Sequence, residues 1–125
     1  MNIEQLVQAE ESTVLEFKQQ CPAPPVMAKT FCAFANTSGG DLVIGVEDRT
    51  HKILGIDENT VIGLEEMIAN VAAGAVSPPV YPIIKAIRFK DRTVIVVHVE
   101  MGYQKPYRVS TGKGKAKVYV RIGSS

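Results

Sequence analysis

Three acidic residues, Glu11, Glu16 and Asp48, have the types and spacing that could support chemistry in this sequence. Glu11 precedes a predicted strand at 14–18 and Glu16 lies within it, while Asp48 follows the apolar run 42–46. Clustered carboxylates supply the hard oxygen ligands that Mg²⁺ and Mn²⁺ prefer, and such ions assist phosphoryl chemistry. Acids at strand ends are also common on a solvated surface, and the spacing alone favours that second interpretation.

Basic residues form a second candidate set, because lysine and arginine neutralise the phosphates of nucleic acids. Six bases and no acid give residues 105–125 a charge of +6, and eight bases against thirteen acids give residues 1–104 a charge of −5. Four more bases lie on a predicted hairpin at 80–100 or in its turn. An ordinary solvated surface is the alternative to a binding surface. The predicted nucleic-acid surface consists of Lys18, Lys85, Arg88, Lys90, Arg92, Lys105, Arg108, Lys113, Lys115, Lys117 and Arg121.

Other kinds of site find no support in the residues. The segment 112–115 lacks the spacing and the following helix of a phosphate-binding loop, so no ATP site is predicted. The glycines in 37–40 follow a helix, whereas a phosphate needs the amides at a helix start. Cys21 and Cys32 belong to no metal-ligand pattern, so we predict two reduced cysteines and no zinc site. Neither histidine is accompanied by a serine or cysteine nucleophile at a suitable spacing, so no hydrolase triad is predicted.

The length of 125 residues predicts one domain, 1–125, and the apolar fraction of 46% is ordinary for a globular protein. No apolar run is long enough to cross a membrane, and the N-terminus lacks the basic start of a signal peptide. We therefore expect a cytoplasmic protein that does not associate with membranes.

Hydrophobic periodicity predicts an α/β (α+β) fold in which two main helices pack on one face of a mixed sheet. Gly39 and Gly40 are predicted to cap the first main helix, and Gly45 to mark a close approach of backbone or of a packed helix. The strand 42–46 is apolar throughout, which is typical of a central strand. The expected helices are 2–9, 25–36 and 59–75. The expected strands are 14–18, 42–46, 53–56, 80–89, 93–100 and 118–122, and the strands 42–46 and 53–56 are expected to form a hairpin.

Four motifs in this order resemble the Schlafen AlbA_2 domain, also known as the divergent AAA-4 domain of RecG-like transcriptional regulators. They are Glu11-Ser12-x-x-x-Glu16-Phe17-Lys18, the segment 33–40, the segment 44–48 with Gly55-Ile56, and the segment 119–125. The resemblance implies an Alba-like fold for the single domain, in which the residues themselves predict a short helix within 1–10 and a basic segment at 101–125. It also implies DNA or RNA binding, a role in transcription regulation or beside a RecG-like helicase, and a homodimer.

The same resemblance implies a second function. Animal Schlafen members that cleave tRNA and rRNA carry a three-carboxylate centre, which by motif falls on Glu11, Glu16 and Asp48 and would make them catalytic residues and ligands of Mg²⁺ or Mn²⁺. Glu47 departs from the usual family acid, and the nuclease members have a duplicated, larger core. The name AAA-4 implies an ATPase, which no residue supports. A nucleic-acid-binding module is the leading hypothesis; a metal-dependent endoribonuclease and a dimerisation or docking module stay open.

Overall fold

The computed structural model describes residues 2–110 and 114–124. Helices and strands alternate up to α3 and only strands follow it among the described residues, and this mixed arrangement confirms the predicted fold class. The elements are α1 Ile3–Gln8, β1 Leu15–Lys18, α2 Pro24–Asn36, β2 Gly40–Ile44, the 3₁₀ turn η1 Glu58–Thr60, α3 Val61–Gly74, β3 Val76–Ser77, β4 Ile83–Phe89, β5 Arg92–Val99, β6 Arg108–Val109 and β7 Lys117–Val118.

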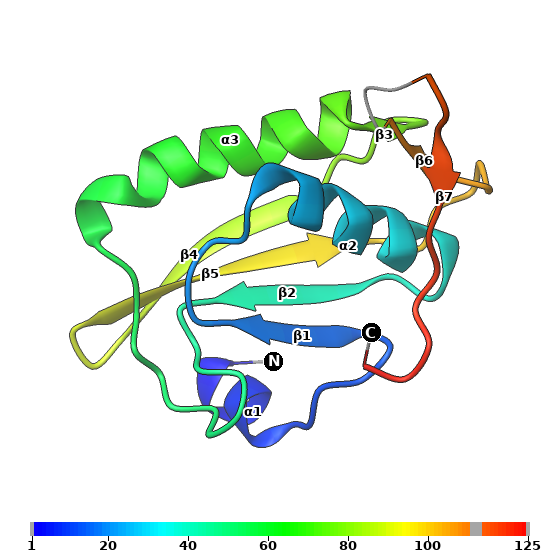
Figure 1. Ribbon diagram of the computed structural model, residues 1–125. Helices are drawn as coiled ribbons and strands as arrows, with labels where there is room; N and C mark the ends of the chain where they lie inside the picture. Colours follow the sequence, from blue (N-terminus) through cyan, green and yellow to red (C-terminus); the bar gives the residue numbers. More distant parts are fainter. Residues whose placement is uncertain (1, 111–113, 125) are drawn as a thin grey trace.

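A four-stranded sheet in the order β1-β2-β5-β4 forms the centre of the molecule (Figure 1). Strands β1 and β2 are parallel and are joined through α2, whereas β5 runs antiparallel to both of its neighbours. A smaller sheet in the order β3-β6-β7 lies beside the ends of α2 and α3 (Figure 1). The central strand β2 is therefore paired on both sides, while β1 and β4 are the edges of the main sheet.

The two main helices, α2 and α3, cover one face of the main sheet, and α1 packs on the opposite face (Figure 1). Side chains of a strand alternate between the two faces. Leu42 and Ile44 of β2 therefore enter the core under α2 and α3, whereas Val43 enters the core under α1. The predicted placement of both main helices on one face is confirmed.

Gly39 ends α2 in the way that the sequence predicts. Its φ angle is +75°, and its amide donates to the carbonyl of Phe34 at 2.8 Å. A Cβ atom on Gly39 would lie 2.7 Å from the Val99 carbonyl oxygen, so the chain passes β5 with no room for a side chain. Gly45 is also confirmed as a close approach, because a Cβ there would lie 3.3 Å from Cα of Gly55.

The predicted hairpin over 42–56 is wrong. Val46 and Ile53 form an isolated bridge rather than part of a ladder, and 53–56 is not a strand. The sheet order gives the reason, since β1 and β5 already occupy both edges of β2. The chain leaves the sheet at Gly45, where φ is +107°, and the Gly45 carbonyl accepts hydrogen bonds from the amides of Leu54 and Gly55.

The predicted last strand, 118–122, is also wrong in extent, because β7 ends at Val118. Beyond β7 the backbone bonds to side chains at the end of α2. Asn36 Nδ2 donates to the carbonyls of Tyr107 and Tyr119, at 2.9 Å each, and Asn36 Oδ1 accepts from the Tyr107 amide at 2.6 Å. The Arg121 amide donates to Thr37 Oγ1 at 3.0 Å. These bonds replace a strand ladder and direct the C-terminal segment towards β1 (Figure 1).

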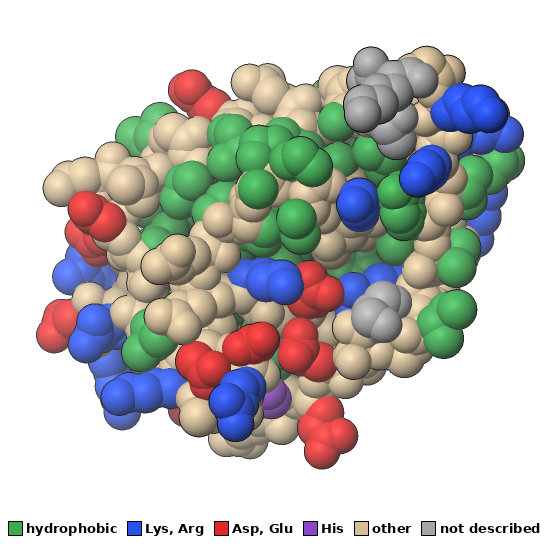
Figure 2. All heavy atoms as spheres, in the orientation of Figure 1, with side chains coloured by type: hydrophobic (Ala, Val, Ile, Leu, Met, Phe, Trp, Pro, Cys, Tyr) green, Lys and Arg blue, Asp and Glu red, His purple; other side chains and the backbone are tan. Residues whose placement is uncertain are grey.

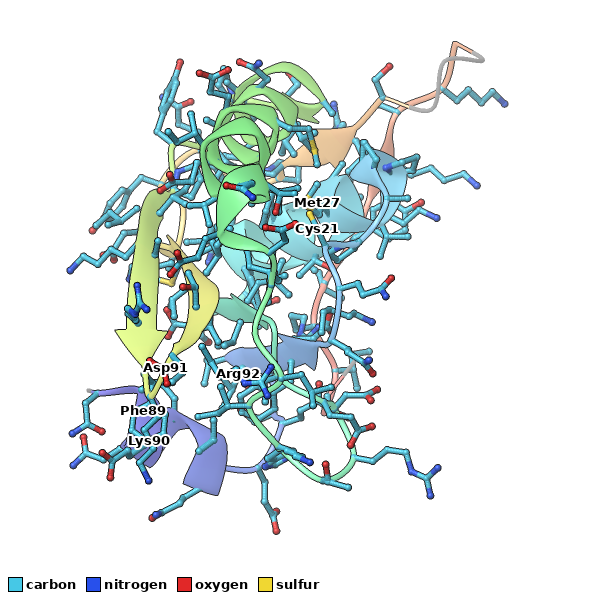
Figure 3. The ribbon with its side chains drawn as sticks, turned by 90° about the vertical axis from the view of Figure 1, so that its left-hand side faces the viewer. Cys21, Met27, Phe89, Lys90, Asp91 and Arg92 are labelled. Carbon is cyan, nitrogen blue, oxygen red and sulfur yellow. The ribbon has the colours of Figure 1, made fainter. Side chains whose placement is uncertain are left out.

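Both cysteines are free, which confirms the prediction of reduced thiols. Cys21 lies next to Met27, with 3.9 Å between the two sulfur atoms (Figure 3), and partial burial raises the pKa of its thiol. Cys32 is fully buried and donates to the Tyr107 carbonyl. Across residues 2–110 and 114–124, no helix has the length and apolar character needed to cross a membrane.

Candidate nucleic-acid interface

The three acids of the predicted metal centre have separate roles in the structure. Glu11 Oε2 accepts the amide of Phe17 at 3.1 Å, so this carboxylate satisfies a backbone donor of the edge strand β1. Glu16 lies within β1 and is buried, whereas Asp48 is exposed in the turn after Val46. Each carboxylate is positioned by a different local structure.

The Glu16 carboxylate is already neutralised by basic side chains. Arg121 Nη1 donates to Glu16 Oε1 at 2.6 Å, and Lys18 Nζ lies 3.8 Å from Oε2. Arg121 also donates from Nη2 to the Ser12 carbonyl at 2.7 Å, and its guanidinium carbon lies 4.9 Å from the centre of the Phe34 ring. A carboxylate held in this way has little charge left to attract a cation.

Asp48 belongs to a turn that is ordered by its neighbour Glu47. Hydrogen bonds from the Thr50 side chain and amide lower the pKa of Glu47 to about 2, with smaller contributions from Arg49 and Asp48. The Thr50 amide lies 2.6 Å from Glu47 Oε2. Glu47, the acid that departs from the family pattern, therefore stabilises the turn that carries Asp48.

No metal site results from these positions. Within the described ranges 2–110 and 114–124, no group of three or more His, Cys, Asp or Glu residues is placed to hold a metal ion. Because Glu16 is paired with Arg121 and Glu11 accepts a backbone amide, the donor set does not fit Mg²⁺ or Mn²⁺. The geometry gives no support to catalytic or metal-binding roles for Glu11, Glu16 and Asp48.

The basic hairpin is formed by β4 and β5, and its turn projects at one end of the sheet, where Figure 3 labels Phe89 to Arg92. Two of its arginines are engaged within the molecule. Arg88 Nη1 lies 2.9 Å from Glu58 Oε1, and Arg92 Nη1 donates to the Leu54 carbonyl at 3.2 Å. Lys85 is exposed in the middle of β4, and the Lys90 amine lies over the Phe89 ring at 5.3 Å. The lysines of this hairpin are therefore more available to contact a phosphate than its arginines.

The basic C-terminal segment lies at the other end of the molecule, around β6 and β7. Figure 2 shows lysine and arginine side chains at this end, at the upper right, and a separate group at the lower left. Arg108, Lys115 and Lys117 are exposed, and no acid occurs after Glu100. Lys105 is exposed and its Nζ donates to the Thr37 carbonyl at 3.3 Å. Lys113 lies outside the described residues.

Arg121 must be removed from the predicted surface set. Its side chain is only 3% exposed, because it packs over Phe34 and pairs with Glu16. Its Nε is buried without a hydrogen-bond partner among the described residues. A guanidinium in this position holds the C-terminal segment against β1 and does not reach a phosphate in solution. Lys18, half-exposed beside Glu16, lies at this junction.

Three features escaped the sequence analysis. Lys29 of α2 places its amine over the Tyr119 ring at 5.6 Å and adds a base to the C-terminal surface. Asn36 anchors Tyr107 and Tyr119, and its position at the end of a predicted helix was the available signal. His98 bonds to Asp41 at 2.9 Å, and only the strand register reveals this contact.

The His98 imidazole lies between two carboxylates. Partial burial favours the neutral ring, but the hydrogen bonds and charges of Asp41 and Glu100 outweigh burial and raise the pKa of His98. Nε2 of the ring lies 3.1 Å from Glu100 Oε1. His98, Asp41 and Glu100 thus form a cluster with two acids on the sheet face opposite α2 and α3. This cluster is not part of the basic surface around β6 and β7.

Comparison with solved structures shows the fold. The N-terminal domain of a protein described as ATP-dependent DNA helicase RecG-related, from Nitrosomonas europaea, matches with a TM-score of 0.69 and 24% identity over 98% of this chain and 87% of that domain. The DIP2311 protein from Corynebacterium diphtheriae matches with a TM-score of 0.64 and 20% identity over 98% of this chain. The chain spans a quarter (25%) of the DIP2311 chain.

The four sequence motifs correspond to positions that the structure explains: the β1 edge, the end of α2, the strand β2 with its turn, and the segment that carries Arg121. The family model "Schlafen, AlbA_2" matches residues 11–125, which is nearly the whole chain. The chain therefore belongs to the Schlafen AlbA_2 family.

Proposed function

We propose that this domain binds DNA or RNA through the basic surface around β6 and β7, and that it serves a larger protein of the transcription-regulator or RecG-related kind. The observation that carries the proposal is the group of exposed bases at this end of the molecule, on a segment with no acid after Glu100. Lysines and arginines gathered without acids attract a polyanion, and phosphate contacts supply most of non-specific affinity.

Three further facts support the proposal. The chain belongs to the Schlafen AlbA_2 family, and a structural neighbour is the N-terminal domain of a protein whose description names a DNA helicase. Lys29 extends the basic surface from the C-terminal segment onto α2. The surface is thus formed by segments distant in sequence that the fold brings together.

The test is fluorescence anisotropy with labelled DNA and RNA at a series of salt concentrations. The double variant Arg108→Gln/Lys117→Gln should weaken binding and reduce the slope of log affinity against log salt by about one for each phosphate that the variant no longer neutralises. The double variant Arg49→Gln/Lys52→Gln removes the same charge from the exposed 49–52 turn and should bind as the wild type does.

The β4–β5 hairpin is the competing surface. The variant Lys85→Gln/Lys90→Gln separates the two, because it changes only that hairpin. A loss of affinity confined to this variant would overturn the assignment to β6 and β7. Absence of binding by the wild type at low salt would overturn nucleic-acid binding itself.

No specific observation favours the two alternatives, a metal-dependent endoribonuclease and a dimerisation or docking module. Glu16 is paired with Arg121, Glu11 accepts a backbone amide, and Asp48 is exposed in a turn. The described exposed side chains at the β4–β5 turn are charged, which is unlike an apolar docking surface. An assay on the same sample, with structured RNA and with or without Mn²⁺, tests the nuclease directly. Cleavage that needs Mn²⁺ and is abolished in Asp48→Asn would restore the three-carboxylate hypothesis.

A further inference from the structure

We propose that the cavity between the start of α2, the end of α3 and the β6–β7 pair accepts one unstacked base of a single-stranded nucleic acid. This inference rests on the proposed function and names the form of nucleic acid that the basic surface selects. It assigns a role to Tyr119, which the surface charges do not use, and adds to the role of Lys29.

The cavity has the size and walls of a small-ligand site. Its volume is about 420 Å³, within the range of pockets that hold small ligands. Most of its walls are apolar, which suits the faces of a base better than a hydrated ion. The apolar walls come from Pro24, Pro25, Ala28, Ala75 and Val109, and the ring of Tyr119 completes them.

Polar groups at the cavity are basic or neutral. Lys29, Lys117 and Ser110 line it, and none of the described residues that line it is acidic. In Figure 2, Lys and Arg side chains lie beside apolar side chains near β7. An apolar cavity between lysines complements a nucleotide, which has a flat ring on one side and a phosphate on the other.

Tyr119 and Lys29 already make the type of contact that a base would replace. The amine of the exposed Lys29 lies 5.6 Å from the centre of the half-buried Tyr119 ring, in a cation–π contact. An entering base that stacks on this ring displaces the amine, and the long lysine side chain can then contact a neighbouring phosphate. The exchange keeps a favourable partner for both residues.

The start of α2 does not offer an anion site that would compete with this arrangement. Pro24 and Pro25 have no amide hydrogen. The amides of Val26 and Met27 both donate to the Ala23 carbonyl, at 2.9 and 3.1 Å. A phosphate at the cavity must therefore be held by side chains, which places it at the lysines and leaves the apolar interior for a base.

Single strands meet the geometric requirement, because their bases are free to leave the stack, and proteins that bind them stack bases on aromatic rings. In a duplex the bases are paired and stacked, so the cavity would receive nothing. We expect the protein to bind a single strand more tightly than the duplex of the same sequence, and to bind an abasic strand of equal charge more weakly.

The test compares two matched variants of the ring. Tyr119→Phe retains the stacking face, and Tyr119→Leu retains apolar packing against the core without it. Tyr119→Leu should lose about 5- to 150-fold in affinity for the single strand, the usual effect of losing one stacked base. Tyr119→Phe should bind as the wild type does, and neither variant should change binding to the abasic strand.

Nuclear magnetic resonance locates the ligand. Titration of the wild type with a dinucleotide should shift the amides of Ala28, Lys29, Val109 and Ser110. Equal affinities of Tyr119→Leu and wild type for the single strand, with both variants folded, would overturn the cavity while leaving nucleic-acid binding intact. The cavity would also be ruled out if Arg108→Gln/Lys117→Gln lost affinity for the single strand and Tyr119→Leu did not. Absence of binding by the wild type would instead contradict the proposed function.

Discussion

Arg121 donates from Nη1 to Glu16 Oε1 at 2.6 Å, and this buried ion pair joins the C-terminal segment to the edge strand β1 across 105 residues of sequence. The side chains are 3% and 12% exposed. The pair explains why two motifs at opposite ends of the chain belong together. It also explains why one acid of the expected metal centre and one base of the expected binding surface are not available for those roles.

Breaking this pair should destabilise the domain strongly. Arg121→Met removes the partner at 2.6 Å from the buried Glu16 carboxylate and leaves the half-exposed Lys18 amine at 3.8 Å, which compensates the charge weakly. Loss of one member of a buried pair typically costs about 3–5 kcal/mol. Urea unfolding of the variant measures the loss. In Glu16→Gln/Arg121→Met, where no uncompensated carboxylate remains, much of the loss should be recovered. A change in Arg121→Met below about 1 kcal/mol would contradict this account.

The exposed pair of Arg88 and Glu58 is the matched control. Its atoms are 2.9 Å apart, but the side chains are 63% and 55% exposed. Solvent screens such a pair, so Arg88→Met should cost less than about 1 kcal/mol in the same unfolding measurement. A large effect in both variants would indicate that arginine packing, rather than burial of charge, determines the result.

Gly39→Ala should destabilise the domain, because φ is +75° there and the new Cβ would lie 2.7 Å from a backbone carbonyl of β5 that cannot move aside. Gly63→Ala is the control. Gly63 is within α3, and a Cβ there meets no described atom within 4 Å, so alanine should stabilise the helix by about 0.5–1 kcal/mol. Thermal unfolding of the two variants should shift in opposite directions, and a shift of the same sign in both would contradict the prediction.

The pH dependence of stability should carry a contribution from His98. The pKa of His98 is raised in the folded protein above its ordinary value, since Asp41 and Glu100 outweigh the effect of burial. A raised pKa means that the folded state binds the proton more tightly, so the contribution is complete below the unfolded pKa of about 6.5 and is lost as pH rises through the folded pKa.

Urea unfolding of the wild type and of His98→Gln at pH values of about 6 and about 9 measures this contribution. The wild type should lose more stability than the variant between the two conditions. A ring titration by nuclear magnetic resonance should place the pKa of His98 lower in Asp41→Asn than in the wild type. An unchanged His98 pKa in Asp41→Asn would show that this hydrogen bond does not cause the shift.

The homodimer implied by the family resemblance stays a prediction, and β4 is the edge on which we expect it. No strand pairs with the outer side of β4 among the described residues, and Ile83 on this strand is 52% exposed. Light scattering should give the mass of two chains, and Ile83→Glu should reduce it to one. A single-chain mass for the wild type at every concentration would refute the dimer.

The sequence by itself determined the two main helices and the four strands of the main sheet, in their order along the chain. Apolar periodicity predicted both main helices and the strands β1, β4 and β5, and the two glycines after residue 38 predicted the end of α2. These features depend on local backbone preferences and on alternation within a few residues, which a sequence displays directly. The motif pattern also predicted the family correctly.

Only the tertiary structure decided which residues meet. The sequence predicted a return strand at 53–56 because it could not show that β5 takes the second edge of β2. It counted Arg121 among solvated bases because burial beside Glu16 depends on a contact across 105 residues. Charge and spacing give the types of group that a chain can use, whereas pairing, burial and availability follow from long-range packing that no short window of sequence contains.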